Sequence, residues 1–285
     1  MTAPRASQSS DTPYRGRTIA VGTRHGKQHQ FAPAFQHLLG ADLTTPPDLD
    51  TDRFGTFTGE IERRGGAADA ARGKALLAMA VTGLPYGLAS EASYGILPGG
   101  WFGHEEVVVF CDTVAGIEVV EGHRSTAVPG YRQRIRRPEE LPGPFVAGLP
   151  DQALTVRPDG AGGDPVKGIT DIDTLAAAIA AAVAASPAGV ALVEPDLRAH
   201  HNPSRRRVLR RLAMTLARRL ATECPACGAP GFGRVDAETG LPCRLCEAPT
   251  ALVRAEIHAC ASCAHQLTRV VSQTADPAMC PSCNP

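Results

Sequence analysis

Short apolar runs of strand length alternate with helix-length amphipathic stretches in the first half of the chain. Residues 18–22 (TIAVG) form a brief apolar run, and apolar positions recur at helical spacing from there to Leu39. A second short run covers residues 41–44, and residues 67–81 are rich in strong helix formers. This pattern predicts a strand, a Gly-containing turn and a helix, followed by another strand and another helix.

The second half continues this alternation with one interruption. Residues 132–163 are rich in Pro and Gly, and we expect long loops there with one strand at residues 153–156. Residues 204–221 form an Arg-rich amphipathic stretch. The remaining expected elements are strands at 87–91, 106–112 and 116–121, the last two in a hairpin, a helix at 170–185 and a strand at 189–194. The alternation predicts an α/β fold, a mixed sheet flanked by helices.

Composition divides the chain into three parts. Residues 1–17 are polar and are expected to be a disordered tail, residues 18–221 to be the α/β domain, and residues 222–285 to be a small Cys-rich domain. Lys plus Arg and Asp plus Glu both number 29, so no global field attracts polyanions or anionic membranes. No run approaches the roughly 20 apolar residues of a membrane span, and we expect a soluble, cytoplasmic protein without membrane contact.

Eight of the nine cysteines lie in the last 62 residues as four Cys-x-x-Cys pairs. The gaps are 15 residues between the first two pairs and 16 between the last two, as in zinc ribbons. Tetrahedral Zn²⁺ takes two thiolates from each of two knuckles, so we predict a double zinc ribbon with two structural zinc ions. The ligands are Cys224, Cys227, Cys243, Cys246, Cys260, Cys263, Cys280 and Cys283.

Two arrangements of these pairs are open. Sequential pairing into two adjacent ribbons is favoured over a cross-braced arrangement in which the first and third pairs share a metal. His258 and His265 lie beside the third pair and are expected to be surface groups or to support the site without binding metal. Because Phe232 is the one aromatic residue of this segment, stacking on nucleic-acid bases is disfavoured. A protein partner or a structural role is preferred, with nucleic acid as the other partner.

The turn after the first strand is a candidate phosphate site. Residues 22–27 (GTRHGK) precede a helix, so free backbone N–H groups and the Lys27 ammonium can converge on a phosphate. A tight turn with a solvated lysine explains the same residues. Cys111 ends an apolar strand and is predicted to be a buried, inert thiol.

Several motifs along the chain resemble the nucleoside triphosphate pyrophosphatases of the inosine triphosphatase, xanthosine triphosphatase and Maf group. They are Thr23 and Lys27 in the turn, Thr56-Phe57 with Glu60, Ala71-Arg-Gly-Lys74-Ala75, Ala89-Ser-Glu91-Ala-Ser93, and Ser204-Arg205 with Leu209 and Leu212. The chain departs from that group at Arg24, where Asn is usual, and at Glu91, where Asp is usual. The whole chain also resembles a bacterial family of unknown function with such a domain and a Cys-rich tail.

This resemblance implies Mg²⁺-dependent hydrolysis of a phosphoanhydride, with non-standard nucleoside triphosphates as substrates. It implies catalytic roles for Glu91, Glu60 and Lys74, with both carboxylates binding Mg²⁺. The phosphate-binding residues that it implies are Thr23, His25, Lys27, Ser93 and Arg205. Surface or capping charges are the simpler reading of each carboxylate. We also predict that Glu91, Lys27 and Lys74 share one cleft.

Two further features remain open. Residues 199–203 (AHHNP) form a polar cluster at a strand end that could clamp a nucleotide. Seven arginines between Arg205 and Arg219 suggest nucleic-acid binding, but a leucine stripe favours a packed helix with a solvated basic face. The leading hypothesis is a nucleotide-binding protein, with pyrophosphatase activity as its specific form. The alternative is a non-catalytic zinc-ribbon module that recognises nucleic acid or a protein.

Overall fold

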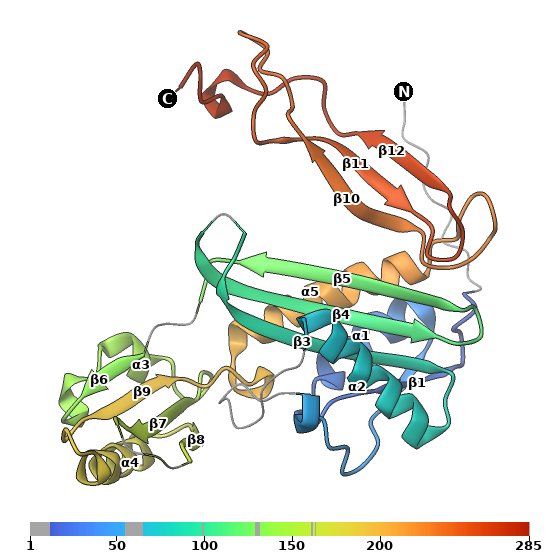
Figure 1. The fold of residues 1–285 in the computed structure, drawn as a ribbon. Coiled ribbons are helices and arrows are strands. Elements are labelled where there is room, and N and C mark those ends of the chain that lie inside the picture. Colours follow the sequence, from blue (N-terminus) through green and yellow to red (C-terminus); the bar gives the residue numbers. More distant parts are fainter. Residues whose placement is uncertain are drawn as a thin grey trace.

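The computed structural model describes residues 12–54, 65–98, 100–128, 132–160, 162 and 164–284. The predicted site residue Glu60 and the Thr56-Phe57 motif lie outside this set, as does most of the N-terminal tail. Within the described part, three sheets form three separate bodies (Figure 1). No helix among these residues is long and apolar enough to cross a bilayer.

The largest body is built on a mixed five-stranded sheet, as the alternating pattern predicted. Its strand order is β2-β1-β3-β4-β5, with β1 parallel to β2 and β3, and with β3, β4 and β5 successively antiparallel. The strands are β1 (Thr18–Val21), β2 (Asp42–Thr44), β3 (Tyr86–Ile96), β4 (Phe102–Asp112) and β5 (Ile117–Ser125). The mixed α/β class is therefore confirmed. Cys111 is buried in β4, as expected.

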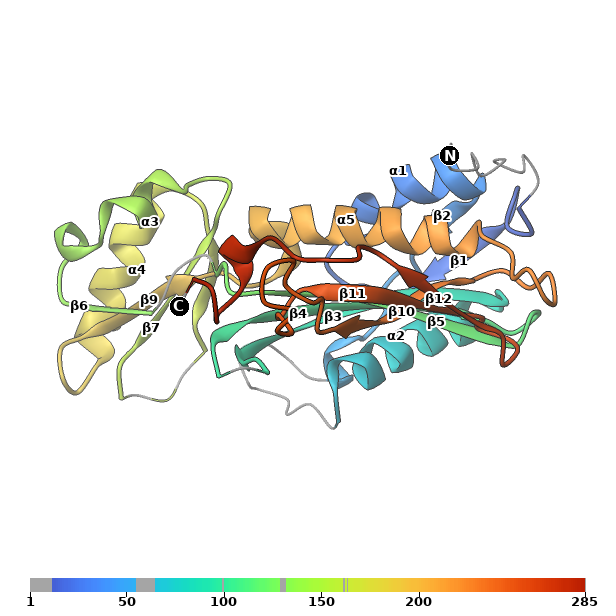
Figure 2. The ribbon, with the colours of Figure 1, turned by 90° about the horizontal axis from the view of Figure 1, so that it is seen from above.

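Helices cover both faces of this sheet. In Figure 2, α1 (Gln28–Leu39) and α5 (Pro203–Leu220) lie side by side along one face, and α2 (Ala67–Thr82) lies on the other. The leucine stripe of α5 is buried against aromatic residues of α1 and against Leu88 and Phe110 of the sheet. The short η1 (Asp52–Phe54) precedes α2. Burial of this stripe leaves most arginines of α5 on its outer side, whereas Arg205 is buried.

A second body, the inserted module of residues 132–196, lies between β5 and α5. Its sheet has the order β6-β9-β7-β8 and its own apolar core. Its elements are β6 (Gln133–Ile135), η2 (Pro138–Glu140), α3 (Gly143–Ala147), β7 (Leu154–Pro158), β8 (Val166–Ile169), α4 (Ile172–Ala185) and β9 (Ala191–Pro195). The expectation of long loops with one strand at residues 132–163 is wrong, because β6 and α3 also form there. Residues 18–221 thus hold two sheets.

Unequal strand lengths in the central sheet create the place where charged residues gather. β1 ends beside β3, with Val21 paired to Leu88, whereas β3 runs on to Ile96. Among the described residues, the pairing of β1 with β3 ends at Val21 and Leu88. Side chains from the β1–α1 turn can therefore reach β3 directly.

The third body is the cysteine module, residues 222–285, which follows α5 directly. It contains the antiparallel strands β10 (Gly233–Thr239), β11 (Val253–Ala259) and β12 (Gln266–Val270), followed by η4 (Pro277–Met279). The Arg219 side chain donates from Nε to the Gly231 carbonyl at 3.0 Å and from Nη1 to Glu121 at 3.0 Å. Through these bonds the base of the module is attached to α5 and β5.

Candidate functional site

The turn that leaves β1 is held tightly against β3 and α2. The Gly22 N–H donates to the Leu88 carbonyl at 2.8 Å, and the Thr23 hydroxyl accepts from the His25 N–H at 3.1 Å. A Cβ at Gly22 would lie 2.2 Å from the Lys74 carbonyl oxygen, which is closer than any real contact. Glycine is required here because the backbone of α2 passes over the turn.

Lys27 is the N-cap residue of α1 and is buried. Its Nζ donates to the Ser90 carbonyl at 2.8 Å and to the Ser90 hydroxyl at 3.1 Å. This carbonyl is available because β1 has already ended. Burial, reinforced by the nearby Arg205 guanidinium, lowers the pKa of Lys27 to about 8.

Lys74 and Glu91 form a buried ion pair on the α2 side of the sheet. The Lys74 Nζ contacts Glu91 Oε2, and the other carboxylate oxygen of Glu91 accepts from the Ala92 N–H at 3.1 Å. Glu91 is 3% exposed. The structure thus joins two residues that the sequence placed in one site.

Arg205 and Glu106 form a second buried pair on the α1–α5 side. The guanidinium donates from Nε and Nη2 to the two carboxylate oxygens at 2.8 and 2.9 Å, and from Nη1 to the Leu197 carbonyl at 2.6 Å. Both residues are fully buried. Burial lowers the pKa of Arg205, but the Glu106 carboxylate outweighs this effect and raises it above its ordinary value. The Asn202 side chain caps α5 by accepting from the Arg205 N–H at 3.1 Å.

These residues form one charge cluster, defined as Lys27, Lys74, Glu91, Glu106 and Arg205. The charges of the other four all act on the pKa of Lys27. Among the described residues, three cations face two carboxylates. Each carboxylate contacts a different cation, and within the described part of the chain the bonds of Lys27 Nζ go to the neutral oxygens of Ser90.

The other predicted site residues lie around this cluster. Thr23 is buried in the turn, and Ser93 is half-buried on β3 two residues beyond Glu91. The His25 ring stacks on His200 of η3 (Ala199–His201), with centroids 4.9 Å apart. Burial, with help from neighbouring His201, lowers the pKa of His200 to about 4. The catalytic and phosphate-binding roles of these residues remain predictions.

The sequence analysis assigned no role to Glu106 or Ser90, and it included Asn202 only in the polar cluster of residues 199–203. Glu106 opens the apolar run of β4 at a position that faces the helices, and a carboxylate beside such a run is a signal for a buried partner. Asn202-Pro203 ahead of an Arg-rich helix is a recognisable capping signal. The partner of Glu106 lies 99 positions away, so no local pattern indicated it.

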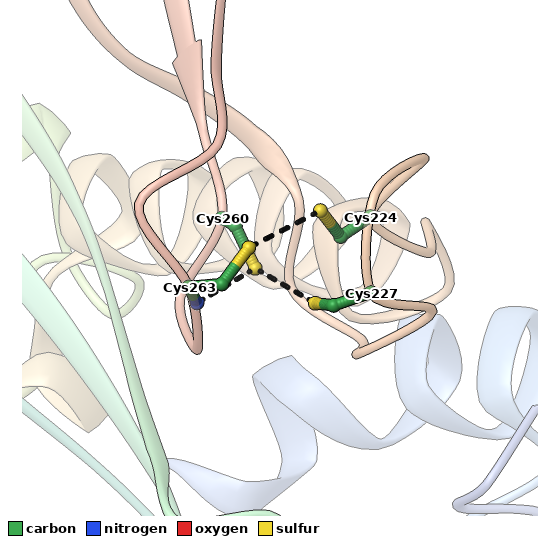
Figure 3. A group of neighbouring side chains, drawn as sticks. All are labelled: Cys224, Cys227, Cys260 and Cys263. Carbon is green, nitrogen blue, oxygen red and sulfur yellow. Dashed lines mark hydrogen bonds between the residues drawn. The ribbon is translucent and has the colours of Figure 1, made fainter.

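The eight cysteines of the cysteine module form two four-thiol clusters. One contains Cys224, Cys227, Cys260 and Cys263, and the other contains Cys243, Cys246, Cys280 and Cys283. The closest sulfurs within each cluster are 3.7 and 3.9 Å apart. Figure 3 shows the first of the two clusters. A tetrahedral zinc with bonds of about 2.3 Å separates its sulfurs by about 3.8 Å. The geometry fits two structural zinc ions and excludes disulfides, whose sulfurs are about 2 Å apart.

The preferred sequential pairing of the cysteines is wrong, because the clusters are interleaved. The first and third Cys-x-x-Cys pairs share one cluster, and the second and fourth share the other. The pairs lie before and after successive strands of an antiparallel sheet. Since each strand reverses direction, alternate pairs meet at the same end of the sheet.

Backbone geometry prepares the knuckles for metal. The N–H groups of Gly228, Glu247 and Asn284 close turns onto the first cysteine of three pairs at 2.8–2.9 Å. Gly228 and Glu247 are left-handed there, with φ of 74° and 61°. His258 and His265 lie near Phe232, with ring centroids 6.1 and 5.7 Å away, and are not in the clusters.

A family match covers most of the chain, including α5, the inserted module and all eight clustered cysteines. The family described as "Domain of unknown function (DUF6671)" matches residues 74–285. The chain belongs to the DUF6671 family. No curated protein matches the chain. The DUF6671 match includes four members of the charge cluster and begins at Lys74, so the turn with Lys27 lies outside it.

Proposed function

We propose that the charge cluster binds the phosphate groups of a nucleotide. The observation that carries this proposal is the buried Lys27 ammonium, whose partners in the described structure are two neutral oxygens. Holding a cation out of water costs several kcal/mol unless a counter-charge compensates. A phosphate beside Lys27 supplies that charge through a charge-assisted hydrogen bond.

The presence of lysine rather than arginine at position 27 also supports a phosphate ligand. The chain contains 26 arginines and only three lysines, and two of these lysines lie in the charge cluster. An ammonium is a compact point charge that fits a single phosphate oxygen in a narrow space, whereas a guanidinium needs a planar partner. The cluster therefore combines two point charges with one planar group at Arg205.

The resemblance to the inosine triphosphatase, xanthosine triphosphatase and Maf group suggests a reaction for such a site. That reaction is the hydrolysis of a nucleoside triphosphate to a monophosphate and pyrophosphate. Mg²⁺ would need carboxylate oxygens, and both described carboxylates of the cluster already contact cations. Glu91 would have to exchange Lys74 for the metal. The described residues thus fit a phosphate group better than they fit Mg²⁺.

Calorimetry with inosine triphosphate, ATP and inorganic pyrophosphate tests the proposal. Lys27→Met keeps the length of the side chain and removes its charge, so it should weaken binding about tenfold or more. Lys167→Met, on β8 of the inserted module, is the matched control and should bind as the unchanged protein does. Equal affinities for all three proteins would exclude the charge cluster as the phosphate site.

Release of pyrophosphate with and without Mg²⁺ separates catalysis from binding. Turnover that Glu91→Gln abolishes while phosphate binding persists would support the pyrophosphatase proposal. Tight binding without turnover for every nucleotide would leave a nucleotide-binding protein and remove the hydrolase.

A non-catalytic binding module is the second candidate, and the charge of the cysteine module favours a protein as its partner. Residues 222–285 carry four arginines, no lysine and six carboxylates. Two zinc ions in four-thiolate sites would each add a net charge of −2. Exposed apolar side chains such as Leu245 and Val270 lie on this acidic surface. Nucleic acid would be repelled, so binding of duplex DNA that depends on Arg254 and Arg269 would contradict this assignment.

A further inference from the structure

Positive charge is concentrated in two segments that are far apart in sequence. Residues 18–41 and 197–222 contain ten Lys and Arg residues and no Asp or Glu. The chain as a whole is balanced at 29 of each sign. These two segments therefore carry a strong local excess of positive charge.

The fold brings the two segments together. They contain α1 and α5, which lie side by side on the face of the central sheet opposite α2 (Figure 2). The buried side of α5 is its leucine stripe, so its other side faces outward. At 100° per residue, Arg207, Arg211 and Arg218 lie within about 40° of one another on that outer side and span about 17 Å of helix.

The outward arginines differ from most other described arginines, because no carboxylate among the described residues forms a salt bridge with them. We name as the arginine face Arg206, Arg207, Arg210, Arg211 and Arg218. Within the described residues, none of the five forms a salt bridge, and their bonds go to neutral oxygens of residues such as Gln30 and Ser204. By contrast, eleven other arginines have a carboxylate partner: Arg72, Arg124, Arg132, Arg134, Arg137, Arg198, Arg205, Arg219, Arg234, Arg244 and Arg254. No carboxylate in the described part of the chain therefore neutralises the arginine face.

We propose that the arginine face binds the phosphate backbone of duplex nucleic acid. A guanidinium fork matches two phosphate oxygens, and α5 supplies forks at one-turn and two-turn spacing along a straight line. A duplex presents one negative charge per about 1.7 Å, so it offers many phosphates over the length of the face. Phe31 and Phe35 are buried and α5 has no aromatic residue, so bases of a single strand would find no stacking platform.

Other anionic partners fit the face less well. An amphipathic helix binds a membrane by inserting its apolar side, and the apolar side of α5 is occupied by the core. An acidic protein would need apolar contacts in addition to charge, and the outer side of α5 offers arginines and Thr215. The face is separate from the buried charge cluster, so this proposal does not depend on phosphate binding at Lys27.

Fluorescence anisotropy of the zinc-loaded full-length protein with labelled duplexes of unrelated sequences tests the proposal. We expect binding that is independent of sequence and that weakens steeply between 50 and 200 mM salt. Replacing Arg207, Arg211 and Arg218 together by Gln should weaken binding about tenfold and reduce the slope of log K against log salt by about three. The matched control replaces Arg134, Arg136 and Arg137, three exposed arginines of the inserted module, by Gln.

Loss of affinity in the α5 variant with retention in the control supports the arginine face, and duplex DNA and duplex RNA distinguish its preferred ligand. An equal loss in both variants would show a nonspecific effect of net charge and overturn the proposal. No binding at 50 mM salt, or tighter binding to phosphatidylserine vesicles or polyglutamate than to any duplex, would overturn it too. Lys27→Met should bind the duplex like the unchanged protein.

Discussion

The α/β body and the cysteine module stabilise their reactive groups in opposite ways. In the charge cluster, Arg205 and Glu106 satisfy each other through two hydrogen bonds, and Lys74 contacts Glu91. In the cysteine module, the thiols of each cluster have mainly one another as neighbours. Four thiolates repel one another unless a cation lies between them.

This difference indicates which part can fold alone. The body buries large apolar side chains such as Phe31, Phe110 and Leu216 around its charges. In the module, every residue of β12 is exposed, and few apolar side chains are buried. We therefore expect the body to be stable from its own packing and the module to be stable only with zinc.

The largest expected effect is that of removing zinc. Structural zinc in small domains contributes about 10–16 kcal/mol of apparent binding free energy, which is also folding free energy. Elemental analysis should find two zinc ions per chain. After chelation, amide exchange should become rapid in β10–β12 and stay slow in β3–β5. If the amides of β10–β12 stayed protected from exchange without metal, the module would be stable without zinc, as the body is. That result would contradict the proposed difference between the two regions.

Double cysteine variants test which cysteines bind the same zinc ion. Cys224→Ser with Cys260→Ser removes two ligands from one cluster, so one zinc should remain. Cys224→Ser with Cys243→Ser damages both interleaved clusters, so both should be lost or weakened. Sequential pairing predicts the reverse order of zinc content, and elemental analysis of the two variants decides between them.

Breaking one buried pair in the body should cost less than losing zinc but still destabilise it strongly. Glu106→Gln removes the carboxylate that pairs with the buried Arg205 guanidinium, for which we expect a loss of about 3–5 kcal/mol in urea unfolding. Glu105→Gln is the matched control, because its partner Arg124 is largely exposed and such pairs contribute about 0–1 kcal/mol. Similar losses in both variants would contradict the burial argument.

Gly22→Ala tests the close approach of α2 to the β1–α1 turn. The added methyl group would meet the Lys74 carbonyl at 2.2 Å, so the turn or α2 must shift, at a cost of about 1–3 kcal/mol. Phosphate affinity should fall as well, because Lys27 follows this turn. Gly95→Ala in β3 is the control, because a Cβ added at Gly95 would have no atom within 4 Å. This variant should bind phosphate as tightly as the unchanged protein does.

The smallest expected effect is a pH dependence of phosphate binding. Lys27 has a pKa of about 8 in the ligand-free protein, and an anion binds its protonated form. Affinity should therefore be highest below pH 8 and fall about tenfold from pH 7 to pH 9, as the protonated fraction falls. Calorimetry at both pH values should show this fall in the unchanged protein. In Lys27→Met the same fall should be absent, and its persistence there would assign it to another group.

Local patterns in the sequence were sufficient for the chemistry of the individual elements. Four Cys-x-x-Cys pairs predicted two four-thiolate sites, because two thiolates on one tight turn bind the same metal wherever the turn lies. The apolar runs located the central strands to within a few residues, since burial on both faces requires continuous apolar stretches. The strand, turn and helix around Lys27 followed from the same periodicity.

Only the tertiary structure decided which of these elements meet. The direction of successive strands places Cys224 beside Cys260 and away from Cys243, and no spacing along the chain encodes that direction. The Pro- and Gly-rich segment became part of a second sheet because β6 and β7 both pair with β9, which comes much later in the chain. The Arg205–Glu106 pair joins two residues of opposite charge because α5 lies across β4. The partners of these groups are far apart in the sequence and close only in the folded protein. The sequence therefore determined the reactive groups, and the fold determined their partners.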